Sequence, residues 1–200
     1  MSGSNPRRIV SLAAGLYSGM LAIGIIWGLA RGLVGEWWAF PGPWDDPGPT
    51  PLSAAGFGLA LGLAGVGLSY LFEKSVAGVR HLGERFGMIL AGVGAKEALL
   101  LALFSSIGEE VLFRGCLQSE LGLVPATILF ALVHIGPERV YLWWTGSAFV
   151  FGLGLGLLYD LQGGLLAPIV MHFVINAINI TLLGRKAARK NADALPAPLS

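Results

Sequence analysis

Long apolar runs alternate with short polar stretches along this chain. Four of the runs carry no charged residue over the length of about 20 residues that a helix needs to cross the hydrocarbon core of a membrane. They are residues 9–30, 47–72, 140–159 and 161–184. The pattern predicts four membrane-spanning helices, with a tight turn at Asp160 and at Gly163 and Gly164 between the last two.

Two further apolar segments lie between the second and third of these runs. Residues 95–119 read as a helix that carries charges, and residues 121–137 form a shorter apolar run. Residues 73–94 mix charged and apolar positions, as in an interfacial helix or loop. We therefore expect an all-α, polytopic membrane protein with about six transmembrane helices.

Composition supports this class, because 54% of the residues are apolar, 12% are charged and the mean hydropathy is +0.71. A formal net charge of +1 gives no indication of a nucleic-acid partner, so we expect none. The single cysteine, Cys116, cannot form an internal disulfide and is predicted to pack as a small apolar side chain. Residues 9–30 are too long for a signal-peptide core, and we interpret them as a retained anchor.

Lysine and arginine collect in segments that fall on one side of the membrane if the chain crosses it six times. These residues are Arg7, Arg8, Lys74, Arg80, Arg85, Arg139, Arg185, Lys186, Arg189 and Lys190. The positive-inside rule places them, and both termini, in the cytoplasm. The loop on the opposite side is rich in proline, and its Trp37, Trp38 and Trp44 are predicted to lie at the membrane interface.

Six polar residues lie inside the predicted spans, where each is costly in hydrocarbon and therefore indicates function. They are Glu109, Glu110, Arg114, His134, His172 and Asn176. Glu110 and Arg114 are four residues apart, so they share a helix face and can form an ion pair. Glu109 is turned by about 100° from Glu110 and is expected to stay free.

The predicted depths of these residues agree with one another. Measured from the outer helix ends at a rise of about 1.5 Å per residue, Glu109 and His134 lie roughly 15 Å deep and His172 roughly 12 Å deep. His172 and Asn176 are also four residues apart and project together from the last helix. We therefore expect the polar faces of three helices to meet at one level.

Three motifs stand in order on these helices: "EEVLFR" at 109–114, "FALVH" at 130–134 and "HFVIN" at 172–176. They complete the pattern E-E-x-x-x-R, F-x-x-x-H and H-x-x-x-N. In this respect the chain resembles the CPBP intramembrane proteases, also called the Abi or type II CAAX-protease family. The resemblance covers roughly residues 95–183 and implies an active site between helices three, four and six.

The apolar runs and the motifs together predict an organisation for the whole chain. Residues 1–94 would hold two membrane helices and the interfacial segment, and residues 95–184 the catalytic core. Residues 185–200 would form a cytoplasmic tail, which we expect to be frayed from Lys186 onward. A chain this short is similar to a minimal bacterial member, located in the cytoplasmic (inner) membrane.

The residue types suit the hydrolysis of a peptide bond in a protein or peptide substrate at the membrane. A carboxylate in a low-dielectric cavity can accept a proton from water, and Glu109 is the candidate base. His134 can hold the same water, while His172 and Asn176 can donate hydrogen bonds to the oxyanion that forms. The resemblance implies the same roles and assigns Glu110 and Arg114 to supporting the architecture.

A metal site is an alternative interpretation of the same residues. Glu109, His134 and His172 could bind a divalent metal such as zinc, because one carboxylate and two imidazoles with an open position form a catalytic zinc set. The spacing lacks H-E-x-x-H. The need for a metal is disputed in the family, so no cofactor is assigned.

Two other classes of function compete with the protease. Buried charges could line the ion path of a transporter or channel, or the chain could be a non-catalytic membrane partner, such as a chaperone or immunity protein. The family cleaves prenylated CAAX tails, bacteriocin leaders or, in its myxosortase subgroup, C-terminal sorting tails of exported proteins. Because the expected depths place the cavity in the outer half of the membrane, exported substrates are favoured.

Overall fold

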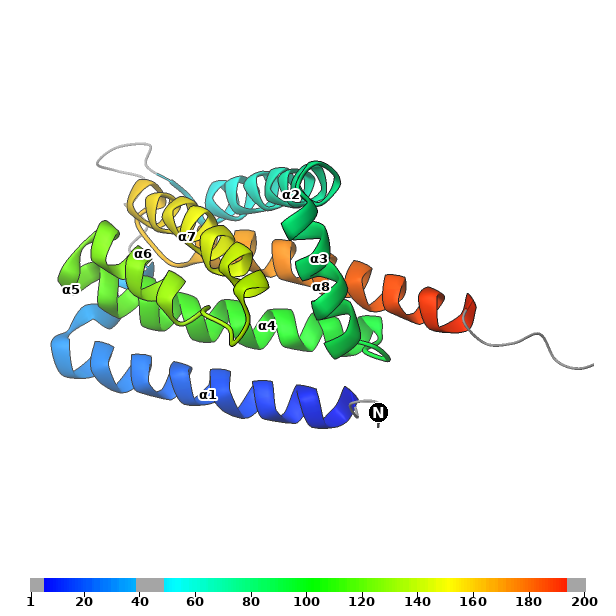
Figure 1. The fold of residues 1–200 in the computed structure, drawn as a ribbon. Coiled ribbons are helices and arrows are strands. Elements are labelled where there is room, and N and C mark those ends of the chain that lie inside the picture. Colours follow the sequence, from blue (N-terminus) through cyan, green and yellow to red (C-terminus); the bar gives the residue numbers. More distant parts are fainter. Residues whose placement is uncertain (1–5, 39–48, 194–200) are drawn as a thin grey trace, which may run out of the picture.

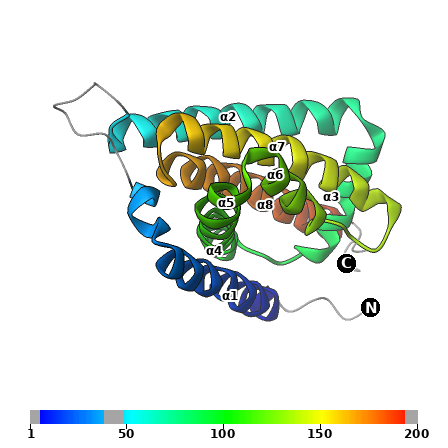
Figure 2. The same ribbon diagram turned by 90° about the vertical axis from the view of Figure 1, so that its left-hand side faces the viewer.

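The computed structural model describes residues 6–38 and 49–193, and within these ranges every regular element is helical. Figures 1 and 2 show the helices gathered in one bundle, with α1 lying along one side of α4. The long helices are α1 (Pro6–Arg31), α2 (Pro51–Ser75), α4 (Ala95–Leu112), α7 (Leu142–Gln162) and α8 (Leu166–Asp193). The shorter elements are η1 (Leu33–Trp38), α3 (Ala77–Ile89), η2 (Phe113–Gln118), α5 (Ser119–Leu121), α6 (Leu123–Leu132) and η3 (Arg139–Tyr141).

Helices α1, α2, α7 and α8 are long and apolar enough to cross a membrane. They correspond to the four charge-free runs in the sequence. The two other expected spans differ from these, because the segment from α4 to α5 carries charges and α6 has only ten residues. An all-α, polytopic fold is confirmed, and the chain is an integral membrane protein.

Helices α4 and α5 are joined through η2, a six-residue π-helix that no sequence pattern indicated. A π-helix widens the turn, and such segments are common at functional sites. Here the indole of Trp37, which is only 4% exposed, donates a hydrogen bond of 2.7 Å to the carbonyl oxygen of Gly115 within η2. The ring of Trp37 therefore packs inside the bundle, and its level at the membrane interface stays a prediction.

Glycines end two of the helices. Gly122 has φ of +85° and separates α5 from α6, and Gly163 ends α7 in the left-handed conformation with φ of +68°. Both positions favour glycine because a Cβ atom is disfavoured there. The apolar run at 121–137 is helical only to Leu132, since turns follow it up to η3.

The basic end of the bundle holds α3 and the end of α8. Helix α3 confirms the helical alternative for the mixed segment at 73–94, and Arg85 on it pairs with Glu138 at 2.7 Å. Helix α8 continues to Asp193, nine residues beyond the expected end of the span. The stretch from 185 to 193 contains no glycine or proline and is rich in the strong helix formers alanine, lysine and arginine. Trp44 and the last seven residues lie outside the described residues.

Candidate active site

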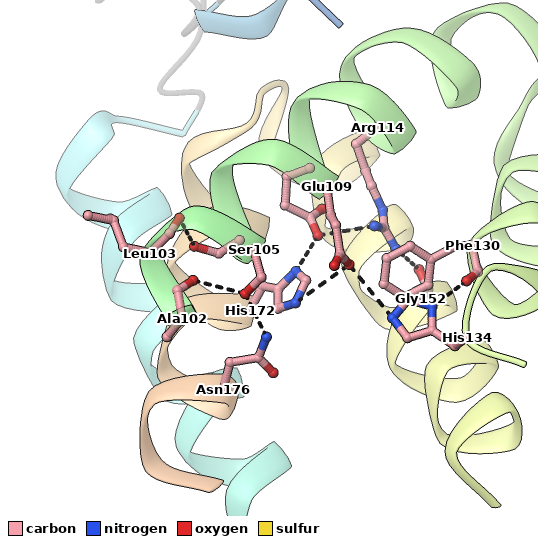
Figure 3. A network of polar contacts seen from close by, with 12 residues as sticks. Ala102, Leu103, Ser105, Glu109, Arg114, Phe130, His134, Gly152, His172 and Asn176 are labelled. Atoms are coloured by element: carbon pink, nitrogen blue, oxygen red, sulfur yellow. Dashed lines mark hydrogen bonds and ion pairs between the residues drawn. The ribbon is translucent and has the colours of Figure 1, made fainter. Parts of the chain in front are cut away.

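All six polar residues singled out from the sequence lie in one region, where α4, α6 and α8 meet (Figure 3). Helix α4 supplies Glu109 and Glu110, η2 supplies Arg114, and the turn that follows α6 supplies His134. His172 and Asn176 project from α8. The polar faces of the three helices therefore meet in the structure, as expected.

Glu110 is the centre of a buried network. Its Oε1 atom accepts a hydrogen bond of 3.0 Å from Arg114 Nη1 and lies 2.7 Å from His172 Nδ1. Arg114 donates a second bond of 2.9 Å to the carbonyl oxygen of Gly152, and its guanidinium lies 4.3 Å from the centre of the Phe130 ring. Glu110 is fully buried and Arg114 is 2% exposed, so each charge is neutralised inside the protein.

Glu109 has a different environment from its neighbour. Its Oε2 atom lies 3.8 Å from His134 Nε2 and 3.9 Å from His172 Nε2, which is too far for a direct hydrogen bond. That oxygen is buried, and no described residue donates a hydrogen bond to it. A buried carboxylate oxygen without a donor is costly, and a water molecule about 2.8 Å from Oε2 and from either nitrogen would satisfy it. The expectation that one glutamate is paired and the other free is met by these contacts.

The hydrogen bonds of the two histidines assign their tautomers. His134 Nδ1 lies 2.6 Å from the carbonyl oxygen of Phe130, which can only accept, so Nδ1 carries the proton. In neutral His134 the Nε2 atom, facing Glu109, is then an acceptor. His172 Nδ1 likewise donates to the Glu110 carboxylate, which stabilises a positive charge on that ring.

The amide of Asn176 is partly engaged within the bundle. Its Nδ2 atom donates a hydrogen bond of 3.0 Å to Ser105 Oγ on α4, and that hydroxyl donates to the carbonyl oxygen of Ala102 at 3.2 Å (Figure 3). An amide carries two N–H donors, so one donor of Asn176 is engaged and the second is left for another acceptor.

Three neighbours of the site escaped the sequence analysis. Ser105 precedes Glu109 by four residues and therefore shares its helix face, a signal that was available in the sequence. Gly152 contributes a backbone carbonyl group, which side-chain motifs do not reveal. Tyr17 on α1 lies close to the Glu109 carboxylate, although no motif marks α1.

The candidate metal ligands were tested against the same geometry. Their facing atoms are one carboxylate oxygen and two imidazole nitrogens, which is a chemically suitable set for zinc. In the described part of the chain, however, no group of three or more His, Cys, Asp and Glu side chains is arranged to hold a metal ion. We therefore derive no step through a metal.

Part of the chain matches the model of a known protein family. Residues 94–178 match the family model described as type II CAAX prenyl endopeptidase Rce1-like. This match covers α4, η2, α5, α6, α7 and the part of α8 that holds His172 and Asn176. It leaves out α1, α2 and α3.

Two proteins of Bacillus subtilis (strain 168) are similar in sequence. The uncharacterized protein YpbD is 35% identical over 83 residues, which is 40% of this chain and 42% of YpbD. The sporulation-killing factor biosynthesis protein SkfC is 23% identical over 148 residues, which is 66% of this chain and 29% of SkfC. The chain thus spans less than half the length of each of these curated relatives, and no solved structure matches it.

The family match and the three motifs coincide on the same helices. Glu109, His134 and His172 all fall inside the matched residues, as do the supporting pair Glu110 and Arg114. The resemblance inferred from the motifs is thereby confirmed, because residues 94–178 match the Rce1-like, type II CAAX prenyl endopeptidase model.

Proposed function

We propose that this protein is an intramembrane endopeptidase that hydrolyses a peptide bond near the membrane, in a tail or leader of a substrate protein. The observation that carries the proposal is the buried Glu109 Oε2, which lies 3.8 and 3.9 Å from two histidine nitrogens and has no donor among the described residues. This arrangement suits a water molecule held between a base and two imidazoles. The family match over residues 94–178 supports the same reaction class.

The side chains divide the proposed reaction between them. Glu109 accepts a proton from the water as it attacks the scissile carbonyl carbon, and His134 Nε2 accepts a hydrogen bond from the same water and orients it. His172, held as an imidazolium by Glu110, and the second N–H of Asn176 donate to the oxyanion. These donors are placed before the reaction, so they need no reorganisation when the negative charge develops.

Glu110 and Arg114 support the site in this proposal. They bind each other, and through Glu110 Oε1 they bind His172 at 2.7 Å. A charged group that is buried without a partner is costly, so Glu110 and Arg114 must stay within contact of each other. Because that geometry includes His172, the pair also fixes the orientation of the imidazole ring.

We further propose the setting of the reaction. The basic ends of the helices, with ion pairs such as Lys186 to Glu73 at 2.7 Å, lie on the cytoplasmic side of a bacterial inner membrane. Both termini are then cytoplasmic, and residues 185–200 form the cytoplasmic tail beside the catalytic core at 95–184. An outward-facing cavity favours the C-terminal sorting tails of exported proteins over CAAX tails that are made inside the cell.

The decisive experiment compares two substitutions on the same helix. Glu109→Gln removes the proposed base but keeps its size, whereas Glu97→Gln makes the same chemical change in the first turn of α4, away from the site. Cells that produce each variant are compared by mass spectrometry of the cleaved termini in their membrane proteins. We expect Glu109→Gln to lose the cleavages made by the wild type, while Glu97→Gln keeps them and both variants accumulate to the same level.

Normal cleavage by Glu109→Gln would overturn the glutamate-base mechanism. A transporter or channel would instead show ion flux in vesicles that depends on Glu109 and no change in cleaved termini. A chaperone or immunity protein on the same fold would retain its effect when Glu109 is replaced by glutamine.

A further inference from the structure

Helix α1 packs along the site although it lies outside the residues that match the family model. Its contact face repeats every three or four residues and includes Tyr17, Met20, Gly24 and Trp27. Met20 packs against the cluster that contains Phe113 and Phe130. One face of α1 therefore borders the same residues that surround Arg114 and His134.

The closest approach of α1 to α4 is beside the proposed base. A Cβ atom added to Gly108 would lie 2.6 Å from the carbonyl oxygen of Tyr17 and 3.3 Å from its Cα atom. Only glycine leaves room for a backbone this close, as in other membrane helix pairs that pack through small residues. Because Gly108 directly precedes Glu109, the close approach brings Tyr17 to the level of that carboxylate.

The Tyr17 side chain uses this position to reach the site. It is half-buried, and its hydroxyl lies close enough to the Glu109 carboxylate for the two groups to interact. The two histidines that face Glu109 belong instead to the turn after α6 and to α8. Glu109 is thus approached from two directions, by the histidines on one side and by the tyrosine of α1 on the other.

We propose that Tyr17 is a positioning residue that holds the Glu109 carboxylate with Oε2 directed at His134 and His172. Its hydroxyl donates to the carboxylate and limits rotation of the glutamate side chain. The consequence for catalysis rests on the proposed function, whereas the placement of the carboxylate does not. On this view α1 completes the site, and residues 94–178 alone lack one of its contacts.

The physical reason is preorganisation. A glutamate side chain has several rotatable bonds, and a base is effective only when its oxygen stays within hydrogen-bonding distance of the proton that it accepts. A hydrogen bond to a charged group is stronger than one between neutral groups. Tyrosine also suits a membrane helix, because its ring is apolar and only its hydroxyl needs a partner.

The first test needs no substrate. The chain contains three histidines, so full-length protein in detergent with ¹⁵N-labelled histidine gives few signals, and His81, which lies on α3 away from the site, is an internal reference. We expect Tyr17→Phe to shift the Nε2 signals of His134 and His172, because the carboxylate that faces them moves. Tyr70→Phe is the matched control, since Tyr70 lies on α2 and is 52% exposed; it should leave both signals unchanged.

The second test measures catalysis with a quenched fluorescent farnesylated CAAX peptide. We expect Tyr17→Phe to lower kcat by about 10- to 100-fold, the range for losing a hydrogen bond to a charged group, with KM unchanged. The acidic limb of its pH–rate profile should move to higher pH, because the ionised carboxylate loses a donor. Tyr70→Phe should match the wild type in all three measurements.

The two tests separate this inference from the proposed function. Unchanged histidine signals in Tyr17→Phe would overturn the positioning role, whatever the activity. A peptide that the wild type does not cleave would count against CAAX processing, and the histidine spectra would still decide the role of Tyr17. If Tyr17→Phe lowers both the melting temperature and the activity but leaves the histidine signals unshifted, Tyr17 is a packing residue only.

Discussion

His172 on α8 and Glu110 on α4 are joined by a hydrogen bond of 2.7 Å between Nδ1 and Oε1. The same oxygen binds Arg114 at 3.0 Å. The second glutamate of the motif therefore stabilises the bundle and also orients a histidine of the site. A substitution that removes Arg114 consequently changes both the packing of α4 and the environment of His172.

Arg114→Ala should destabilise the protein more than Glu109→Ala does. It leaves Glu110 fully buried with its charge uncompensated by the guanidinium, and breaking a buried ion pair costs about 3–5 kcal/mol. Glu109 has no close ion-pair partner to leave unpaired. Thermal unfolding in detergent should show a clearly lower melting temperature for Arg114→Ala. Equal melting temperatures for the two variants would contradict the assignment of the pair.

Gly152→Ala should also destabilise the protein. A Cβ atom at this position would lie 2.9 Å from Phe130 Cδ1 and 3.5 Å from Arg114 Nη2, so the aromatic ring under the guanidinium must shift. Overpacking of this kind costs about 1–3 kcal/mol. Gly154→Ala on the same helix is the control, because its nearest neighbour, Met171 Cε, is at 3.7 Å. Unfolding midpoints that fall equally for both variants would show that the close packing of Gly152 is unimportant.

Ser105→Ala should weaken the proposed oxyanion contact while the fold is retained. The Asn176 amide would lose its 3.0 Å hydrogen bond, which is worth about 0.5–1.5 kcal/mol, and would be less well oriented. We expect a several-fold decrease in kcat for any peptide that the wild type cleaves. Ser147→Ala, which removes a hydroxyl bonded only to the Trp143 carbonyl group of its own helix, should have no effect. An unaltered kcat in Ser105→Ala would separate Asn176 from the reaction.

The orientation of the bundle can be tested with reporter fusions. A reporter joined after Lys186 should lie in the cytoplasm, and one inserted within residues 39–48 should lie outside, because the basic segments favour the inner face. Alkaline phosphatase activity at the insertion and green fluorescence at the fusion are the expected results. The reverse pattern would overturn both the topology and the preference for exported substrates.

Much of the site could be predicted because the side chains that form it repeat at helical spacing. Glu110 and Arg114, and likewise His172 and Asn176, must share helix faces at a separation of four residues. Charges are too costly in hydrocarbon to face lipid, so the three polar faces had to meet. The helix boundaries were less accurate, because neither the π-helix in η2 nor the continuation of α8 to Asp193 follows from hydropathy alone.

The remaining contacts depend on how the helices rotate and cross. That His172 Nδ1 binds Glu110, and not a substrate oxygen, depends on the angle of α8 against α4. The proximity of Tyr17 to Glu109 depends on the approach of α1 at Gly108. In the sequence, Tyr17 is one aromatic residue in an apolar run, and Trp37 is one of several tryptophans in a loop. Tertiary packing determines which aromatic residues contact the site, and a single sequence does not show how the helices pack.

The pairing of α1 with α4 has a consequence for biogenesis. Helix α1 and the following η1 are synthesised first, but their hydrogen-bonded partners come much later. Arg31 of α1 binds Glu120 and Trp37 of η1 binds Gly115, 89 and 78 residues further along the chain. Only 6% of the residues in the most apolar stretch of α1 are buried within the protein, so this helix can remain in lipid without them. Helix α4 enters with two glutamates that hydrocarbon does not solvate, and α8, which brings His172, emerges last. During synthesis Arg114 is therefore the first partner of Glu110, and His172 joins the two glutamates only when the final helix has been made.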